Sequence, residues 1–586
     1  MGSLATNQVT PRSPSDPYYD LGKFALTVSS QSAEAQVWFN RALLWTYCFN
    51  HDEAITCYKQ ALAYDSSLAI AYWGVSFCSG PNYNKTWRLF DERDKLDAIA
   101  NTYAYSQLAL QAVGNATEWE AAVIRALAKR YPNNDPTRDL AACDKAYADA
   151  MREVYGRFSK RDGSDDFDTI TLFADALMNV APRKLFDSTT GLPIPTSPVA
   201  EVRTLLEKSL ELPGVEKHPG VAHMYIHLME MSATPEAALK AADMIRELVP
   251  DTGHTYHMPA HIDVLVGDYR RAVEYNLKAT IADDKFFKND GGLTFYSYYR
   301  MDDYHSLIYA AMLAGKSKAA LSATTRMEAA ITEDILRVEK PALANWMEFF
   351  LAVRVHVYIR FGMWDELLAL EILEDKNLYC VTNVMRHYGK AIAHAAKWQV
   401  DKAEEERKLY EAAAKIVPPT RLDFPNKITD ILHVATAMLD GEIEYRKGNY
   451  DVAFQRLRDA ISLEDKLPFA EPWGWMLPAR HAYAALSLEQ RHVDQALHAY
   501  AEDLQFVPTP GRPHQHPNNI WALHGYHECL VRVGREAEAN IIKRLLVVAA
   551  AEADVKINSS CFCRLGTKPG CEGKTKKNGC HSTGSK

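Results

Sequence analysis

The sequence lacks the short motifs that identify several common enzyme classes. No Gly-x-Gly-x-x-Gly, phosphate-binding loop, Gly-x-Ser-x-Gly or paired Cys-x-x-Cys pattern occurs in its 586 residues. Such motifs hold nucleotides, present a nucleophilic serine or bind zinc. The sequence therefore gives no support to nicotinamide, ATP or serine-hydrolase chemistry.

Long apolar runs and basic stripes are also missing. No uninterrupted apolar stretch of about 18 residues is present, so we expect no membrane span. The net charge is −9, and no Lys/Arg stripe is interleaved with aromatic residues, which excludes nucleic acid as the expected partner. The first twenty residues have no apolar segment of the kind found in secretory signals, and we predict a cytoplasmic protein. Gly2 and Thr6 match the loose myristoylation pattern, which we interpret as a chance match.

What the sequence does contain is a helical pattern that repeats about every 34 residues. The clearest unit covers residues 35–68, and its large and small positions are Trp38, Ala42, Trp45, Ala54, Tyr58 and Ala61. Small residues at such positions let two helices cross closely, and large ones fill the gaps between them. Further units are marked by Ala238, Ala272, Ala403, Ala453, Ala496 and Trp521.

The pattern predicts an all-α, tetratricopeptide-like α-α superhelix over residues 31–555. We expect a flexible N-terminal segment at 1–30 and a disordered Cys-rich tail at 556–586, where the apolar periodicity stops. Residues 160–168, 187–198 and 283–303 are predicted to be loop insertions that close a groove. Beta structure should be negligible, and the cysteines within helical patterns should be buried thiols.

Six of the twenty histidines fall between residues 218 and 261. The segment VAHMYIHLME places His223, His227 and Glu230 on one face of a helix, at positions i, i+4 and i+7. The segment GHTYHMPAHI places His257 and His261 on one face of another. Pro259 is compatible with a first helical turn, which would leave His254 just outside the helix.

These two faces predict a metal site. Both helices are the first helix of consecutive repeats, and such helices pack side by side about 10 Å apart. We therefore expect His223, His227, His257 and His261 to be ligands of one or two transition-metal ions. Glu230, His254 and His305 would be further ligands or acid–base groups. Many imidazoles and few carboxylates favour copper or iron over zinc, although zinc also fits.

The same residues carry a resemblance to a known family. The resemblance rests on residues 49–84, 218–250 and 253–279, which contain the strings FNHDEA, YWGVSFCSGPNYN, HPGVAHMYIHLME and GHTYHMPAHI. They resemble a family of large tetratricopeptide-repeat proteins of bacteria and filamentous fungi with Tyr-Ile-His and His-Met-Pro-x-His motifs. The resemblance covers most of residues 35–550 and lies in polar residues that a repeat scaffold does not need. Most members have no assigned reaction, so the resemblance implies a fold more than an activity.

The resemblance also implies a set of substrate-binding residues: His51, Trp73, Asn82, Asn84 and Asn179. Arg183 follows Pro182 where members of the family have Pro-Trp, which suggests an anionic ligand. Tyr304 precedes His305 at the end of an aromatic run. Arg480 follows two tryptophans in EPWGWMLPAR and could hold an anionic or aromatic substrate.

Two further groups of residues have a weaker signal. His514, His516, His524 and His527 form a second concentration of histidines, which we interpret as a solvated loop and helix surface. Cys561, Cys563, Cys571 and Cys580 in the tail have thiol ligands for zinc or copper, but their spacing matches no compact zinc motif.

Two functions follow from these features. The first is a metal-dependent oxidoreductase that acts on a small molecule in the concave groove. The second is a non-catalytic scaffold that binds a protein or peptide partner, and a zinc-dependent hydrolase or lyase is a further alternative. A peptide-binding groove favours a basic, Asn-rich clamp, whereas the helices here offer His and Tyr, which favours the enzyme.

Overall fold

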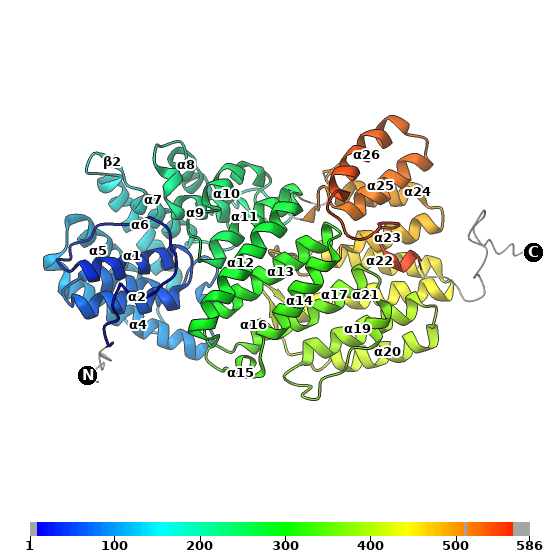
Figure 1. Ribbon diagram of the computed structural model, residues 1–586, viewed down its shortest axis with the longest axis horizontal. Helices are drawn as coiled ribbons and strands as arrows, with labels where there is room; N and C mark the ends of the chain where they lie inside the picture. Colours follow the sequence, from blue (N-terminus) through cyan, green and yellow to red (C-terminus); the bar gives the residue numbers. More distant parts are fainter. Residues whose placement is uncertain (1–8, 509–510, 512–513, 566–586) are drawn as a thin grey trace, which may run out of the picture. The chain divides into compact units, whose positions relative to one another are not determined.

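The computed structural model describes residues 9–508, 511 and 514–565 and is an all-α, tetratricopeptide-like protein (Figure 1). The chain divides into two compact units. Unit 1 comprises Met1–Asp263, Glu274–Asp303 and Val338–Ala342, and unit 2 comprises Val264–Val273, Tyr304–Arg337 and Leu343–Lys586. No helix of the described residues is long and apolar enough to cross a membrane.

Unit 1 is built from antiparallel helix pairs, of which α1–α2, α3–α4 and α5–α6 pack most closely. Its helices are α1 (Ala33–Tyr47), α2 (His51–Tyr64), α3 (Ala69–Cys78), α4 (Glu92–Ala112), α5 (Glu118–Arg130), α6 (Leu140–Phe158), α7 (Phe167–Met178), α8 (Val199–Ser209), α9 (Pro219–Met229) and α10 (Leu239–Ile245). Side chains that cap helix N-termini fix several of these starts, as Asn50 does for α2 and Thr117 for α5.

Unit 2 repeats the same construction in α19–α20, α21–α22, α23–α24 and α25–α26. Its helices are α14 (Ser317–Ala330), α15 (Glu333–Leu336), α16 (Ala344–Met347), α17 (Val353–Arg360), α18 (Trp364–Leu368), α19 (Cys380–Ala396), α20 (Val400–Ala414), α21 (Ile428–Lys447), α22 (Tyr450–Glu464), α23 (Ala479–Glu489), α24 (Val493–Asp503), α25 (Ile520–Arg532) and α26 (Glu536–Ala550). Three more helices contribute residues to both units: α11 (Gly253–Val266), α12 (Tyr269–Asp290) and α13 (Tyr296–Leu313).

Strands are confined to two small hairpins among the described residues, which confirms the all-α prediction. β1 (Lys160–Arg161) pairs with β2 (Ser164–Asp165), and β3 (Leu422–Asp423) pairs with β4 (Asn426–Lys427). The first hairpin lies within the loop expected at 160–168. The loop expected at 283–303 is largely helical, because α12 continues to Asp290 and α13 begins at Tyr296.

The two ends of the repeat region differ from the expected boundaries. Tyr18 packs on the first helix pair, where its hydroxyl donates to Glu53 at 2.6 Å and accepts from the Trp45 indole at 2.8 Å. Residues 9–30 are therefore a packed segment. At the other end, Ser560 and Cys563 are buried in unit 2, so the chain stays packed beyond residue 556. Residues 566–586, with the rest of the expected tail, lie outside the described residues.

The helix crossings follow the residue sizes that the repeat pattern predicts. Ala42, Ala54 and Ala61 are fully buried between α1 and α2. Gly74 of α3 lies against the ring of Tyr58 of α2, where an added Cβ would come within 2.3 Å of the ring carbon Cζ. The expectation of buried helical thiols is also confirmed for Cys48, Cys57, Cys78, Cys380 and Cys529, whereas Cys143 of α6 is only partly buried.

We expect Gly74→Ala to lower the free energy of unfolding by about 1–3 kcal/mol, because the methyl group overpacks the contact with Tyr58. The control is Gly156→Ala in α6, where no atom lies within 4 Å of the added Cβ. That change should be neutral or stabilise by up to about 1 kcal/mol, since alanine is the better helix former. Urea unfolding followed by circular dichroism measures both, and equal effects of the two changes would contradict the close crossing.

Candidate metal centre

Five histidines come together in the interior of unit 1 and are named the histidine cluster: His223, His227, His254, His257 and His261. His223 and His227 lie one turn apart on α9, with ring centroids 4.7 Å apart. His257 and His261 have the same spacing on α11, with centroids 4.6 Å apart. All five side chains are buried. The structure thus brings together the two His-x-x-x-His faces.

The start of α11 differs from the sequence-based expectation. The helix begins at Gly253, so His254 lies in its first turn and Pro259 lies inside it. Proline has no amide hydrogen, so the Thr255 carbonyl lacks its usual partner within the helix. The earlier start brings His254 Nε2 to 3.1 Å from His223 Nε2.

The orientation of four rings is set by acceptors at Nδ1. The pairs are His223 with the Tyr47 carbonyl at 2.7 Å, His257 with the Asn276 amide oxygen at 2.9 Å, and His227 and His261 with Glu230 at 3.2 and 2.6 Å. A carbonyl or carboxylate oxygen can only accept, so each Nδ1 carries the proton. In a neutral imidazole the other nitrogen, Nε2, then has a free lone pair. Hydrogen bonds of this kind fix metal-binding histidines in many proteins.

The Nε2 atoms consequently face one another. His257 Nε2 and His261 Nε2 lie 2.7 Å apart although both are acceptors in the neutral state. Such a contact needs a second proton on one ring, a rotated Asn276 amide that leaves the His257 proton on Nε2, or a cation bound by both rings. Ligand atoms of His223, His227 and His254 also lie within 4.8 Å of one another, as do those of His227, Glu230 and His261. This donor set fits a transition-metal ion.

Burial keeps these rings in the form that binds metal. Loss of hydration lowers the pKa of His223, His227, His254 and His257 well below the ordinary value, and neighbouring imidazoles lower it further. The rings are therefore neutral at physiological pH. A neutral imidazole is the ligating form, so no proton has to leave these rings before an ion binds.

Both carboxylate oxygens of Glu230 accept hydrogen bonds. It caps the C-terminus of α9, is fully buried, and accepts from Nδ1 of His227 and of His261. Arg183 Nη1 donates to Oε1 of the same carboxylate at 3.2 Å. Arg183, predicted to bind an anionic ligand, thus has an internal anion as its partner. The carboxylate orients two rings of the cluster, which is a positioning role.

Aromatic rings enclose the cluster, and sequence reasoning missed them. Phe49 stacks on His227 with centroids 5.5 Å apart and on His254 with centroids 5.3 Å apart. Tyr83 contacts His227, and Tyr299 contacts His254. Phe49 lies in the tight turn between α1 and α2 with a φ of 58°, and only this fold-dependent turn aims its ring at the cluster.

An acidic group beside His257 was also missed. Asp303 Oδ1 lies 3.4 Å from His257 Nδ1, and Asp302 Oδ2 lies 3.7 Å from His257 Nε2. Burial raises the pKa of Asp303 well above its ordinary value, and the charges of Asp283 and Asp302 raise it further. Burial also raises the pKa of Asp283, to about 7. Gly253 makes room for this pair, since an added Cβ would meet Asp283 Oδ1 at 2.2 Å.

Two of the predicted substrate-binding residues line a cleft of unit 1. His51 and Asn82 border a cavity of about 200 Å³, together with Phe49 and Tyr299, the two aromatic residues that contact the cluster. Burial lowers the pKa of His51 to about 4, so the ring is neutral. The cleft therefore places a neutral imidazole next to the aromatic wall of the cluster, and charged side chains such as Lys85 also line it.

The remaining candidates in unit 1 have structural contacts. Trp73 is buried and stacks on Phe77, with ring centroids 5.3 Å apart. Asn84 forms a turn in which its backbone N–H donates to Asn82 Oδ1 at 2.9 Å. The side chain of Asn179 donates to Asp175 Oδ1 at 2.9 Å at the end of α7.

Three predicted site residues belong to unit 2 and have partners there. His305 Nε2 lies 3.1 Å from the Met476 sulfur, and Tyr304 beside it is buried. Arg480 forms a bidentate ion pair with Asp465 at 2.7 and 2.9 Å. The contacts of His305 and Arg480 given above lie within unit 2.

The second concentration of histidines is only in part the solvated surface that we expected, because His524 and His527 are partly exposed and the other two are not. His514 and His516 are both buried. His516 Nδ1 donates to Asp503 at 2.7 Å, and His481 Nε2 donates to the same carboxylate at 2.8 Å. The loop folds inward because a buried carboxylate needs donors.

Comparisons with known proteins do not name a family. No family model matches the chain, and no curated protein matches it. The structure of Naa15/Naa10 bound to HypK-THB matches 88% of this chain and 70% of that chain, with 15% identity and a TM-score of 0.22. The crystal structure of the yeast Tom70 matches 89% of this chain and 92% of that chain, with 12% identity and a TM-score of 0.26. These scores support no functional argument, and the resemblance to the bacterial and fungal family stays a prediction.

We expect the stability of unit 2 to fall as the pH drops below about 6.5, the pKa of an unfolded histidine. Burial lowers the pKa of His305 and of His356 to about 3, so below pH 6.5 only the unfolded chain binds these two protons. Each histidine then lowers the free energy of unfolding by about 1.4 kcal/mol for each pH unit of acidification. Urea unfolding at pH 7.5 and at pH 5.5 measures the change. Between these two values the free energy of unfolding of His305→Gln should fall by about 1.4 kcal/mol less than that of the wild type. An unchanged dependence would contradict the neutral buried ring.

Proposed function

We propose that the chain is a helical-repeat protein that binds a transition-metal ion in the histidine cluster of unit 1. One observation carries the proposal: rings held at Nδ1 turn unprotonated Nε2 atoms toward one another, down to 2.7 Å between His257 and His261. Lone pairs repel at that distance, and a bound cation replaces the repulsion with two coordinate bonds. Nothing in the described cluster is a thiol, so imidazole nitrogen dominates the donor set.

The donor set favours copper, iron or zinc. Imidazole suits all three ions, whereas calcium and magnesium prefer oxygen ligands. Phe49, Tyr83 and Tyr299 would shield the ion from solvent, and the cleft of about 200 Å³ beside them would admit a small molecule. Redox chemistry on such a molecule, with copper or iron, is the finer part of this proposal and rests on the donor set alone.

Binding of a protein partner is the second candidate function. It is favoured by α26, the last α-helix among the described residues of unit 2, on which Ile541, Val547 and Val548 are more than half exposed. Terminal helices of repeat proteins normally present a polar outer face, so this apolar face would suit a partner. A metal-free protein after expression in metal-replete medium would leave partner binding as the function.

We expect near-stoichiometric copper, iron or zinc in the purified protein by plasma mass spectrometry. The variant His223→Ala/His257→Ala should lose the metal, because it removes an Nε2 from each of the two helices. The matched control is His394→Ala/His498→Ala, which removes two histidines of unit 2 outside the cluster. Retention of metal by the first variant, with circular dichroism unchanged, would rule out the cluster as the site.

Glu230→Gln should weaken metal binding about 10- to 100-fold without abolishing it, because the carboxylate orients the ligands from outside the coordination shell. Competition with a chelator of known affinity measures the change. The nearby control Glu207→Gln alters an exposed carboxylate that pairs with Arg203. A complete loss of metal in Glu230→Gln would instead make Glu230 a ligand, and an unchanged affinity would remove it from the centre.

A further inference from the structure

The segment that follows α26 folds back into unit 2 and fills part of its interior. Arg360 Nη1 donates to the Ser560 carbonyl at 3.0 Å, and the Ser560 hydroxyl donates to the His481 carbonyl at 2.8 Å. Arg446 Nη2 donates to the Cys563 carbonyl at 2.5 Å. These contacts come from α17, α23 and α21, so the segment is held from three sides.

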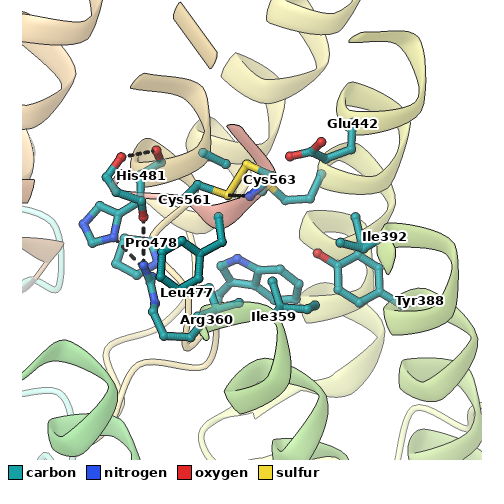
Figure 2. A pocket seen from close by; sticks show the side chains of 15 residues that line it. Ile359, Arg360, Tyr388, Ile392, Glu442, Leu477, Pro478, His481, Cys561 and Cys563 are labelled. Carbon is teal, nitrogen blue, oxygen red and sulfur yellow. Dashed lines mark hydrogen bonds between the residues drawn. A yellow bond between two sulfur atoms is a disulfide. The ribbon is translucent and has the colours of Figure 1, made fainter. Parts of the chain in front are cut away.

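This docking places two sulfur atoms next to a buried carboxylate. Cys561 and Cys563 form a disulfide, and Glu442 of α21 is the third member of a group whose ligand atoms all lie within 4.8 Å of one another. Figure 2 shows the Glu442 carboxylate turned toward the disulfide. Glu442 is only 2% exposed, and Arg446 lies 3.4 Å from its Oε2.

The sulfurs and the carboxylate border a small cavity. Its free volume is about 40 Å³, and Ile359, Ile392 and Leu477 are among the apolar residues that line it (Figure 2). A water molecule needs about 10–15 Å³ of such space, so the cavity has room for an ion and a water ligand. An apolar wall strengthens the attraction between a cation and its anionic ligands, because the local dielectric constant is low.

We propose that reduction of the Cys561–Cys563 disulfide creates a second metal site, which takes a thiophilic divalent cation such as Zn²⁺. The ligands are the two thiolates and Glu442, and a water molecule completes the tetrahedral set that zinc prefers. Two thiolates and one carboxylate carry three negative charges. The ion and the guanidinium of Arg446 balance them inside the unit.

The site has two chemical states. A small-molecule dithiol or two monothiols reduce the disulfide, the S–S bond breaks, and the reductant leaves as its own disulfide. The ion then replaces the two thiol protons. In the reverse direction a small-molecule disulfide takes two electrons from the thiolates, its S–S bond breaks, and it leaves as thiols after taking up two protons. The protein disulfide forms again, and the ion is released.

The proposed site shares no residue with the histidine cluster, and a single probe distinguishes the two sites. Co²⁺ is the probe, because thiolate ligation gives a charge-transfer absorption in the near ultraviolet that imidazole ligation does not. The oxidised full chain, with the disulfide confirmed by non-reducing mass spectrometry, should show no such band. After reduction the same protein should develop the band with about one equivalent of Co²⁺.

Two variants and two control variants sharpen the result. Cys561→Ser/Cys563→Ser should lose the band, and Glu442→Gln should weaken Co²⁺ binding at this site at least tenfold. The matched controls Cys143→Ser and Cys571→Ser/Cys580→Ser should keep it. Cys143 is a free cysteine of unit 1, and Cys571 and Cys580 lie outside the described residues.

Retention of the band in Cys561→Ser/Cys563→Ser, or an equal band in the oxidised protein, would overturn the proposal. Loss of the band in Cys571→Ser/Cys580→Ser would assign it to other cysteines and overturn it as well. The comparison of oxidised with reduced wild-type protein needs no substitution, so it stands even if a variant fails to fold.

Discussion

Unit 1 depends on one constraint: several imidazoles buried together must stay neutral, and each Nδ1 proton must have an acceptor. Charged rings at this depth would repel one another without water to screen them. The Tyr47 carbonyl, Asn276 and Glu230 meet the constraint from three different helices. Glu230, which joins the end of α9 to His261 of α11, therefore also orients rings of the cluster. Stability of this part of the fold and its capacity to bind an ion rest on the same hydrogen bonds.

The pairing of residues along helices could be predicted from the sequence. An i, i+4 spacing fixes the face of a helix whatever surrounds it, so His223 with His227 and His257 with His261 follow from periodicity alone. The same holds for the small residues at crossings, such as Ala42 and Ala54. Pro259 misled the prediction, because its preference for a first turn is statistical and packing placed it within α11.

Other parts of the site could not be predicted, because they depend on contacts between distant segments. Phe49 reaches the cluster from a turn about 180 residues earlier, and no local pattern distinguishes it from a core phenylalanine. His305 was expected near the cluster because it follows in the next repeat, yet its partner is Met476. His516 looked solvated in a polar loop, and only the fold shows the carboxylate of Asp503 that holds it inside. Sequence distance is a poor guide to a partner whenever a loop enters the interior.

The return of residues 559–564 into unit 2 has a consequence for the order of biosynthesis. Ser560 meets Arg360 across 200 positions of the chain, and both are buried. While the ribosome is still translating that interval, the apolar walls around Ile359 and Trp475 have no covering segment. Nascent unit 2 is therefore incomplete until residues 559–564 emerge from the ribosome. Chaperones would have their longest access to this stretch, and a premature stop that removed only the final few per cent of the chain would leave the interior open.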